Sequence, residues 1–592
     1  MNWEEIIAAA GLSRRPPHWD ERYSKGIENM SKPLYQMIVE RDLFMTCRDG
    51  VRLAVDIYRP DARDNEAFPG LVAWSSYGKG VQMIKREPLQ FKAVLMDHTI
   101  EAGDIEFYVR RGYVVAIPDA RGVGKSEGHW DGLYGKQEQE DCYDVIEWLA
   151  DEPYCNSNIG MIGISYFSII QPLVAALKPP HLKAIMMCEV VDSLYLHNYI
   201  GGAFFDRSFL YNHFCPVNSP LSWSERRYPQ DELLRRVEQR RNDPDVSSSA
   251  LLTRVLGCWP PRHQSYFFDV ILHNLDDEFW AERSLMGKEK DIDIPMYLLS
   301  EYYDRGRFTQ GPFHLYNKCN QNLPRKLFAP ESHDDIFLPH RTLSEEFVRW
   351  YDYWLKGVDT GIMNEPPIKL KVEGDGRFRY EYEWPIARTQ WQKLYLHEGG
   401  NMDFEAPAGP EAPGMLYHEP PLEKPLFPRQ VPSFSYITQP LEMDMEVTGP
   451  LTLYLSTSID KTDANLIVLL NDVLPDGRRQ YITSGGTRMS HRLIGFDEGK
   501  PFAPQHDHTR NVPVTPGKVE LQVIEIMTIC RVFKAGHRIE IVLKNFTPSE
   551  FNFITFIPAA EPIHYEFHSG KGTESYLLLP VIPSPPPENW VR

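Results

Sequence analysis

The chain has 592 residues, which is too long for one hydrophobic core, so several domains of roughly 100–200 residues each are expected. Its 42% hydrophobic, 12% aromatic and 24% charged residues are typical of a folded globular protein and exclude global disorder. A formal net charge of −19 repels polyanions, which argues against nucleic acid and anionic membranes as partners.

The N-terminus and the cysteines bear on location. The first 15 residues, MNWEEIIAAAGLSRR, place acidic residues before a short apolar stretch, unlike a secretory signal. Apolar runs such as YVVAIP and LIVLL are strand-sized and fall short of the roughly 18–20 residues that cross a bilayer. The eight cysteines include no C-x-x-C pair, which disfavours zinc and a disulfide scaffold. We therefore expect a soluble, cytoplasmic protein with reduced thiols and no membrane partner.

After an N-terminal extension over residues 1–35, predicted strands and helices alternate from residue 36 to residue 189, beginning with VRLAVDIYRP. Such alternation predicts a mostly parallel sheet covered by helices. In the helical stretch EDCYDVIEWLADE, acidic residues take the first turn and one face. The opposite face should pack on the sheet and consists of Cys142, Val145, Ile146 and Leu149.

Residues 190–290 lack this alternation. Segments such as YLHNYIGGAFFDRSFLYNHF and DELLRRVEQRRND are typical of helices without intervening strands, which predicts an inserted helical cap. Strand character returns over residues 291–362 in IDIPMYLLS and RKLFAPESH, followed by the helical LSEEFVRWYDYWLKG. The α/β unit is expected to close there.

Residues 363–592 are predicted to form a separate β domain. Proline and glycine accumulate, and short strands such as PIKLKVEG, PLTLYLST, NLIVLLNDV and RIEIVLKNF alternate with turn residues. Many short strands without a helical period indicate a β-sandwich or jelly roll. The terminal PSPPPENW is typical of a solvated tail.

One serine stands where a strand meets a helix. In GMIGISYFS, Ser165 follows a strand and a turn of small residues, which is the plan of a nucleophile elbow that lifts a hydroxyl above the sheet edge. The strict G-x-S-x-G pattern fails at Phe167. A serine in this place is also a common helix N-cap, so this segment alone leaves both interpretations open.

A serine nucleophile needs a histidine to accept its proton and a carboxylate to orient the histidine. In α/β-hydrolases these follow the serine in the order acid, then histidine, each in a loop after a late strand. Asp304 ends the strand-like IPMYLLSEYYD, and His333 ends RKLFAPESH. With 19 histidines and 82 acidic residues in the chain, order and topology make this pair a candidate and no more.

Longer motifs bring in a family resemblance. The G-x-S-Y elbow at Gly163 to Tyr166 is joined by DARGVGKSEG, which fits D-x-R-G-x-G-x-S-x-G, and by FVRWYDYWLKGVDTG and DVLPDGRRQYITSGGTR. In these motifs the chain resembles the cocaine-esterase-like (CocE/NonD) serine hydrolases, relatives of the X-prolyl dipeptidyl peptidases and α-amino acid ester hydrolases. The resemblance implies an α/β-hydrolase domain with an inserted helical cap and a C-terminal β jelly-roll domain.

Carried over residue by residue, the resemblance implies a catalytic triad of Ser165, Asp304 and His333. It also implies an oxyanion hole formed by the hydroxyl of Tyr77, in SSYGKG, and the backbone N–H of Tyr166. No metal or organic cofactor is required by this chemistry.

The chain departs from the family pattern near the nucleophile and near the histidine. Ser168 stands where the family usually has glycine, and it could cap or pack in the first helical turn. APESH replaces the common GPWSH, so that Glu331 could raise the pKa of the histidine or face water.

The substrate is less defined. Gly306 and Arg307 stand where amino-acid ester hydrolases carry acidic residues for a substrate ammonium, and only about 35 residues precede the first strand, whereas the X-prolyl peptidases carry a sizeable N-terminal domain. Arg305 and Arg307 could favour an anionic acyl group or simply stay solvated. Several cap aromatics suggest a bulky or aromatic substrate, although helix packing is their commoner use: Tyr195, Tyr199, Phe204, Phe205, Phe209, Tyr211 and Phe214.

The sequence therefore predicts a serine hydrolase that cleaves a small-molecule ester, or less readily an amide, through an acyl-enzyme. An acyltransferase or biosynthetic cyclisation enzyme with the same triad, and an X-prolyl peptidase, remain alternatives, and a homo-oligomer is possible. The least favoured alternative is a binding protein in which the β domain holds a ligand and the hydrolase domain is a relic.

Overall fold

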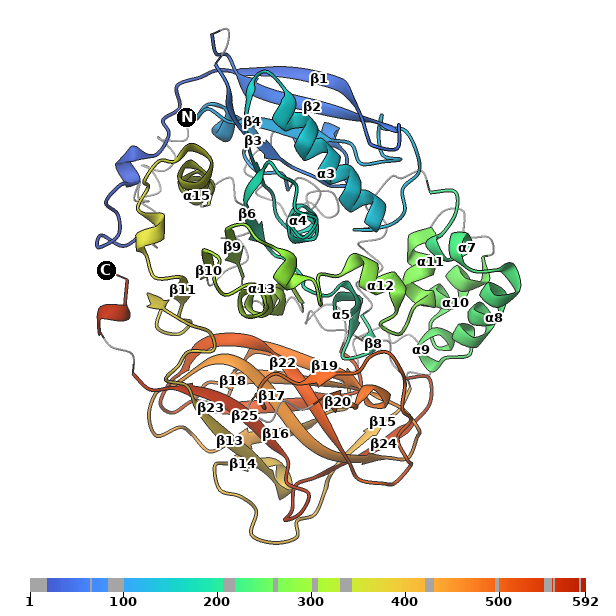
Figure 1. Ribbon diagram of the computed structural model, residues 1–592. Helices are drawn as coiled ribbons and strands as arrows, with labels where there is room; N and C mark the ends of the chain where they lie inside the picture. The colour runs from blue at the N-terminus through green and yellow to red at the C-terminus, as the bar shows by residue number, and fades with distance from the viewer. Residues whose placement is uncertain are drawn as a thin grey trace.

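The computed structural model describes residues 19–63, 66–83, 101–205, 219–258, 265–300, 307–330, 343–420, 431–495, 500–547, 556, 559–584 and 587–591. Figure 1 shows a sheet with flanking helices, a group of helices beside it and a β domain beneath both. No helix within the described ranges combines the length and hydropathy needed to span a bilayer.

The N-terminal half is built on a ten-stranded sheet whose inner strands run parallel, as the α/β pattern predicts. Antiparallel pairs lie only toward its two edges. The inner strands are buried along almost their whole length, which explains their continuous apolar runs. In spatial order the strands are β1 (Met37–Thr46), β2 (Arg52–Pro60), β4 (Val114–Pro118), β3 (Phe68–Val72), β5 (Cys155–Met161), β6 (Leu182–Cys188), β9 (Met296–Leu299), β10 (Arg325–Ala329), β11 (Ile368–Lys371) and β12 (Phe378–Glu381).

The last two of these strands correct the predicted domain assignment. PIKLKVEG was expected to open the β domain, but β11 pairs in parallel with β10 and extends the α/β sheet. The reason is that an isolated short apolar strand carries no sign of its partner, and β10 offers it an unpaired edge.

Helices cover this sheet in two groups (Figure 1). Helix α3 contacts α4 and β5, whereas α2 contacts α15. The four residues of α3 predicted to face the sheet are fully buried, which confirms that prediction. Of the acidic residues predicted on the other face, Asp141 is buried too, as is Glu138 in the first turn of α3. The helices are α2 (Ile105–Val109), α3 (Lys136–Asp151), α4 (Tyr166–Ala175), α13 (Arg307–Lys318) and α15 (Ser344–Lys356).

A run of helices lies between β6 and β9, at the place of the expected cap (Figure 1). It follows α5 (Leu194–Asn198) and a hairpin of β7 (Tyr199–Ile200) and β8 (Ala203–Phe204). The expectation of continuous helix is therefore wrong at the hairpin. The helices are α7 (Trp223–Arg227), α8 (Gln230–Arg241), α9 (Pro244–Ser247), α10 (Ala250–Gly257), α11 (Ser265–Leu272) and α12 (Glu278–Arg283).

Two glycines explain the hairpin. Gly201 and Gly202 have φ of 57° and 87°, a region that favours glycine. A Cβ on Gly201 would overlap the carbonyl of Gly486, and one on Gly202 would overlap the ring of His491. The hairpin thus lies against the β domain, and the backbone N–H of Arg488 donates to the Gly201 carbonyl at 2.9 Å.

The β domain has its own core, separate from that of the α/β domain. Nine strands form a closed hydrogen-bonded ring, because β25 pairs with both β13 and β17. The predicted jelly roll is thus barrel-like. The ring runs β17 (Met445–Ile459), β22 (Glu520–Phe533), β19 (Arg479–Arg488), β18 (Asn465–Val473), β23 (Arg538–Lys544), β16 (Phe434–Thr438), β14 (Asn401–Asp403), β13 (Gln390–His397) and β25 (Tyr576–Ile582); β24 (Ile563–His568) and β15 (Gly414–His418) extend it from β17.

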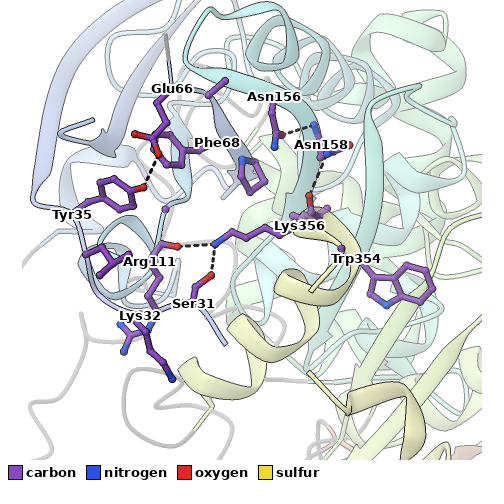
Figure 2. A pocket seen from close by; sticks show the side chains of 16 residues that line it. Ser31, Lys32, Tyr35, Glu66, Phe68, Arg111, Asn156, Asn158, Trp354 and Lys356 are labelled. Carbon is purple, nitrogen blue, oxygen red and sulfur yellow. Dashed lines mark hydrogen bonds between the residues drawn. The ribbon is translucent and has the colours of Figure 1, made fainter. Parts of the chain in front are cut away.

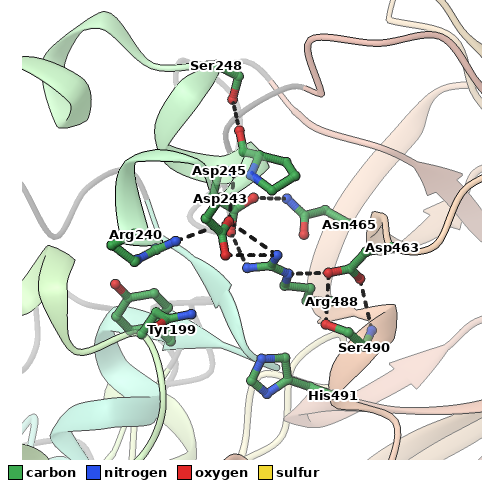
Figure 3. Close-up of polar contacts among 12 residues, drawn as sticks. Tyr199, Arg240, Asp243, Asp245, Ser248, Asp463, Asn465, Arg488, Ser490 and His491 are labelled. Atoms are coloured by element: carbon green, nitrogen blue, oxygen red, sulfur yellow. Dashed lines mark hydrogen bonds and ion pairs between the residues drawn. The ribbon is translucent and has the colours of Figure 1, made fainter. Parts of the chain in front are cut away.

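An ion cluster joins the cap to the β domain (Figure 3). Arg488, at the end of β19, contacts Asp463 at 2.6 Å within its own domain and, across the interface, Asp245 at 3.0 Å and Asp243 at 3.2 Å. Arg240 of α8 contacts Asp243 at 3.0 Å. Although burial would lower it, the carboxylates raise the pKa of Arg488 well above its ordinary value.

Candidate active site

Ser165 lies in a strained turn between β5 and α4. Its backbone adopts φ 53° and ψ −113°, a conformation that non-glycine residues seldom take and that clusters at functional sites. Gly163, with φ 115°, makes the turn possible, because a Cβ there would overlap the Cβ of Phe167 and approach the Glu101 carbonyl at 3.0 Å. The turn thus has the backbone geometry of a nucleophile elbow, although Phe167 stands at the position of the second glycine.

Ser168 holds this turn against the sheet. Its buried hydroxyl donates to the Gly163 carbonyl at 2.8 Å and accepts from the backbone N–H of Cys188 at 2.7 Å. The N–H of Ser165 in turn donates to the Cys188 carbonyl at 3.0 Å. Ser168 therefore packs in the first helical turn, one of the two uses open to it from the sequence.

Ser165 lines a small cavity of about 20 Å³. Tyr77 and Tyr166 both line it, with ring centroids 5.2 Å apart, so three of the five expected site residues lie together. Ser165 itself is only 8% exposed. The other described lining residues are Leu133, Tyr134, Ile169, Leu194, His197, Asn198 and Phe308.

Asp304 and His333 lie outside the described residues. The strands that precede them are β9 and β10. β10 pairs in parallel with β9, β9 with β6, and β6 with β5. Because the carboxyl ends of parallel strands meet at one edge, the chain leaves β9 and β10 at the sheet edge where Ser165 follows β5.

A buried carboxylate lies beneath the elbow. Glu138, in the first turn of α3, accepts from the Tyr166 hydroxyl at 2.5 Å and from the indole N–H of Trp74 at 2.9 Å on one oxygen. Its other oxygen accepts from the backbone N–H of Tyr134 at 2.6 Å. Burial raises the pKa of Glu138 to about 7, against the effect of these three donors.

Two family models match the chain. The model of the X-Pro dipeptidyl-peptidase (S15 family) matches residues 49–334, and the model of the C-terminal non-catalytic domain of X-Pro dipeptidyl-peptidase matches residues 360–554. Cocaine esterase of Rhodococcus sp. (strain MB1 Bresler) is 24% identical over 92% of this chain and 98% of its own.

Solved structures agree in fold. A CocE/NonD family hydrolase from Staphylococcus aureus is 21% identical, with a TM-score of 0.72 over 92% of this chain and 94% of its own. An α-amino acid ester hydrolase is 18% identical, with a TM-score of 0.68 over 92% and 97%. The chain belongs to the CocE/NonD and S15 family of serine hydrolases. The fold predicted from the sequence, an α/β-hydrolase with a C-terminal β domain, is confirmed.

Several residues that line or lie beside the cavity of this hydrolase have no signal in the sequence. Tyr134 and Glu138 stand four residues apart at the start of a helix, which is also the pattern of an ordinary helix first turn. His197 of α5 lines the cavity and packs edge-on against Phe308, with ring centroids 4.8 Å apart. Burial lowers the pKa of His197 to about 4, so its imidazole is neutral near pH 7.

Arg307 of the hydrolase is neither solvated nor available to a substrate. It is 3% exposed and donates through Nη2 to both carboxylate oxygens of Asp192, at 2.5 and 2.7 Å. Its Nη1 contacts Glu525 of β22 at 3.3 Å. The expectation of a substrate-binding or solvated Arg307 is therefore wrong, because a buried guanidinium needs a carboxylate partner. Arg305 and Glu331 lie outside the described residues.

The described cap aromatics serve packing. Tyr195 and Tyr199 stack with ring centroids 5.3 Å apart, and their hydroxyls donate to the carbonyls of Asn274 and Val270. Phe204 and Phe205 are buried as well. None of these four lines the Ser165 cavity. Three other expected aromatics lie outside the described residues: Phe209, Tyr211 and Phe214.

A larger cavity, of about 650 Å³, lies elsewhere (Figure 2). Tyr35, Phe68 at the start of β3 and Asn156 near the start of β5 line it, so it opens at the sheet edge opposite Ser165. The ammonium of Lys356 is already held there by the Ser31 hydroxyl at 2.8 Å and the Arg111 carbonyl at 2.7 Å. Size alone does not make this cavity the catalytic one.

Proposed function

We propose that this hydrolase cleaves a carboxylic ester through an acyl-enzyme on Ser165. The observation that carries the proposal is the strained Ser165 turn, held open to a cavity that Tyr77 and Tyr166 also line. A residue held in a rarely populated backbone conformation costs on the order of 1–3 kcal/mol and persists where the surrounding structure enforces it. Here Gly163 and Ser168 do so.

The proposed reaction follows from the chemistry of these groups. His333 takes the proton of Ser165 as its oxygen attacks the ester carbonyl, and Asp304 holds the imidazole. The Tyr77 hydroxyl and the Tyr166 backbone N–H donate to the oxyanion. Collapse expels the alcohol, protonated by His333, and a water activated by the same histidine then releases the acid.

An ester substrate is supported by the relative named cocaine esterase, whose alignment spans nearly all of both chains. The S15 model keeps an X-prolyl peptide as the second candidate substrate. Acyl transfer to an alcohol or amine would use the same acyl-enzyme, with another nucleophile in place of water.

Intact-mass labelling with a fluorophosphonate tests the nucleophile. We expect one adduct on the wild-type chain and none on Ser165→Ala, while Ser157→Ala, at the other end of β5, should still be labelled. Labelling that persists in a folded Ser165→Ala variant would contradict the assignment.

Parallel assays with a short-chain aryl ester and with an X-prolyl p-nitroanilide separate the two substrate classes. We expect the ester to be turned over with the larger kcat/KM. A larger kcat/KM for the anilide would assign the protein to the peptidases.

A further inference from the structure

The carboxylate of Glu138 ties together three segments around the Ser165 cavity. Tyr166 begins α4, Trp74 follows β3, and Tyr134 precedes α3. All three present donors to Glu138, at 2.5, 2.9 and 2.6 Å. Two of the three, Tyr166 and Tyr134, also line the cavity.

Tyr134 is itself held in a strained conformation. Its φ of 58° is rare for a residue with a bulky side chain. Glu138 accepts a hydrogen bond from the Tyr134 N–H, and the side chain of Gln139, which follows Glu138, donates to the Tyr134 carbonyl at 2.7 Å. The ring of Tyr134 lies 4.6 Å from that of Tyr166, and its hydroxyl bonds none of the described residues. Two consecutive side chains thus fix a tyrosine against the residue that follows the nucleophile.

We propose that Glu138 is a positioning residue, whose carboxylate fixes Tyr166 and Tyr134 as adjoining walls of the Ser165 cavity and thereby aims the Tyr166 backbone N–H at the oxyanion. The inference rests on the proposed function, because it assigns a role to Tyr166 in that reaction.

The ionised form of Glu138 suits this role. A carboxylate only accepts, and all three partners donate, whereas a protonated carboxyl must donate one hydrogen itself. Trp74 and the Tyr134 amide cannot accept it, so protonation would reverse the bond to Tyr166. The titratable groups that face Glu138 are Asp141 and Cys142 on α3, Tyr134 before it and Tyr166 on α4.

Glu138→Gln is the first test, because the amide keeps the shape but presents an N–H₂ group to one of the three donors. We expect kcat for the aryl ester to fall on the order of tenfold with a small change in KM, since misplacement of an oxyanion donor acts on the transition state. The matched control is Glu140→Gln, which removes a carboxylate of the same helix that pairs with Lys136 at 3.6 Å. Equal kcat in the two variants would overturn the inference.

Tyr166→Phe is the second test and keeps the ring and the backbone N–H while removing the bond to Glu138. We expect a smaller loss of kcat, and a double variant that loses less than the product of the single losses, because both changes break one contact. Melting temperatures identify variants that fail to fold. A Tyr166→Phe variant that folds and keeps wild-type kcat would also contradict the inference.

The acid limb of the pH profile separates positioning from support of the fold. On the acid limb, log kcat/KM of Glu138→Gln should rise with a slope of one, for His333, whereas that of the wild type should rise more steeply through the pKa of Glu138, by about a further tenfold. An unchanged slope would overturn the inference. If the wild type neither reacts with the fluorophosphonate nor turns over either substrate, the proposed function fails instead, so the two failures are distinguishable.

Discussion

Arg307 and Asp192 form a buried bidentate ion pair between the start of α13 and the segment after β6. Although burial would raise it, Arg307 holds the pKa of Asp192 well below its ordinary value. We expect Arg307→Ala to lower the free energy of unfolding by about 3–5 kcal/mol, because it leaves the buried Asp192 without its guanidinium partner, although the His314 imidazole still lies 3.2 Å from its carboxylate. Urea denaturation measures this.

The matched control is Arg52→Ala, because Arg52 pairs with Glu127 at the surface. It should leave the free energy of unfolding nearly unchanged, because an exposed ion pair contributes little to stability. The ratio of kcat/KM for neutral and carboxylated esters should stay the same in Arg307→Ala, and a loss of preference for the carboxylated ester would reinstate a substrate role for Arg307.

Ser168→Ala should destabilise the turn that holds Ser165. The change leaves the Gly163 carbonyl and the Cys188 N–H without their partner in a buried place, which costs about 1–3 kcal/mol per group. We expect a lower melting temperature and slower fluorophosphonate labelling of Ser165. Labelling at the wild-type rate in this variant would show that the turn keeps its conformation without Ser168.

The stability contributed by Glu138 should depend on pH with a definite sign. Its pKa is raised from about 4.5 to about 7 on folding, so the folded protein binds the proton more tightly. That stability is fully present below about pH 4.5 and is lost as the pH rises through about 7. Relative to Glu138→Gln, the wild type should lose on the order of 3 kcal/mol over this interval.

Urea denaturation at several pH values from 5 to 8, in the Ser165→Ala background, measures the difference. Glu140→Gln should show no such trend. A difference between wild type and Glu138→Gln that is constant with pH would mean that Glu138 titrates alike in the folded and unfolded chain.

Arg488→Met should loosen the cap from the β domain. It leaves Asp243, Asp245 and Asp463 close together without the guanidinium that compensates their charge. We expect faster hydrogen exchange in α8 and α10 than in the wild type. Arg478→Met, at an exposed turn of the β domain, is the control, and equal exchange in both variants would contradict a joining role for Arg488.

Local patterns predicted much of the fold. The apolar face of α3 and the turn around Ser165 could be recognised because their signals lie within about ten residues of chain. The longer motifs then supplied the family. Tyr77 could be placed beside Ser165 only by that resemblance, since 88 residues separate them in the sequence.

What the sequence could not predict depends on distant partners. Glu138 and Arg307 are charged residues, which are usually solvated. They are buried here because other segments supply hydrogen-bond donors to Glu138 and carboxylates to Arg307. Likewise β11 belongs to the α/β sheet because β10 offers it an edge to pair with, and the hairpin at Gly201 forms where it packs against β19. Such matches are properties of the folded chain, so no local window contains them.

Through the hairpin of β7 and β8, the β domain supports the Ser165 cavity without lining it. None of the described lining residues of the Ser165 cavity comes from that domain, yet α5, which supplies three of them, continues directly into a hairpin held against β19. The catalytic half is therefore not a transplantable module. If the β domain were exchanged for that of a distant relative, the new domain would have to preserve the surface against which Gly201 and Gly202 pack. Otherwise α5, and with it one wall of the Ser165 cavity, would shift.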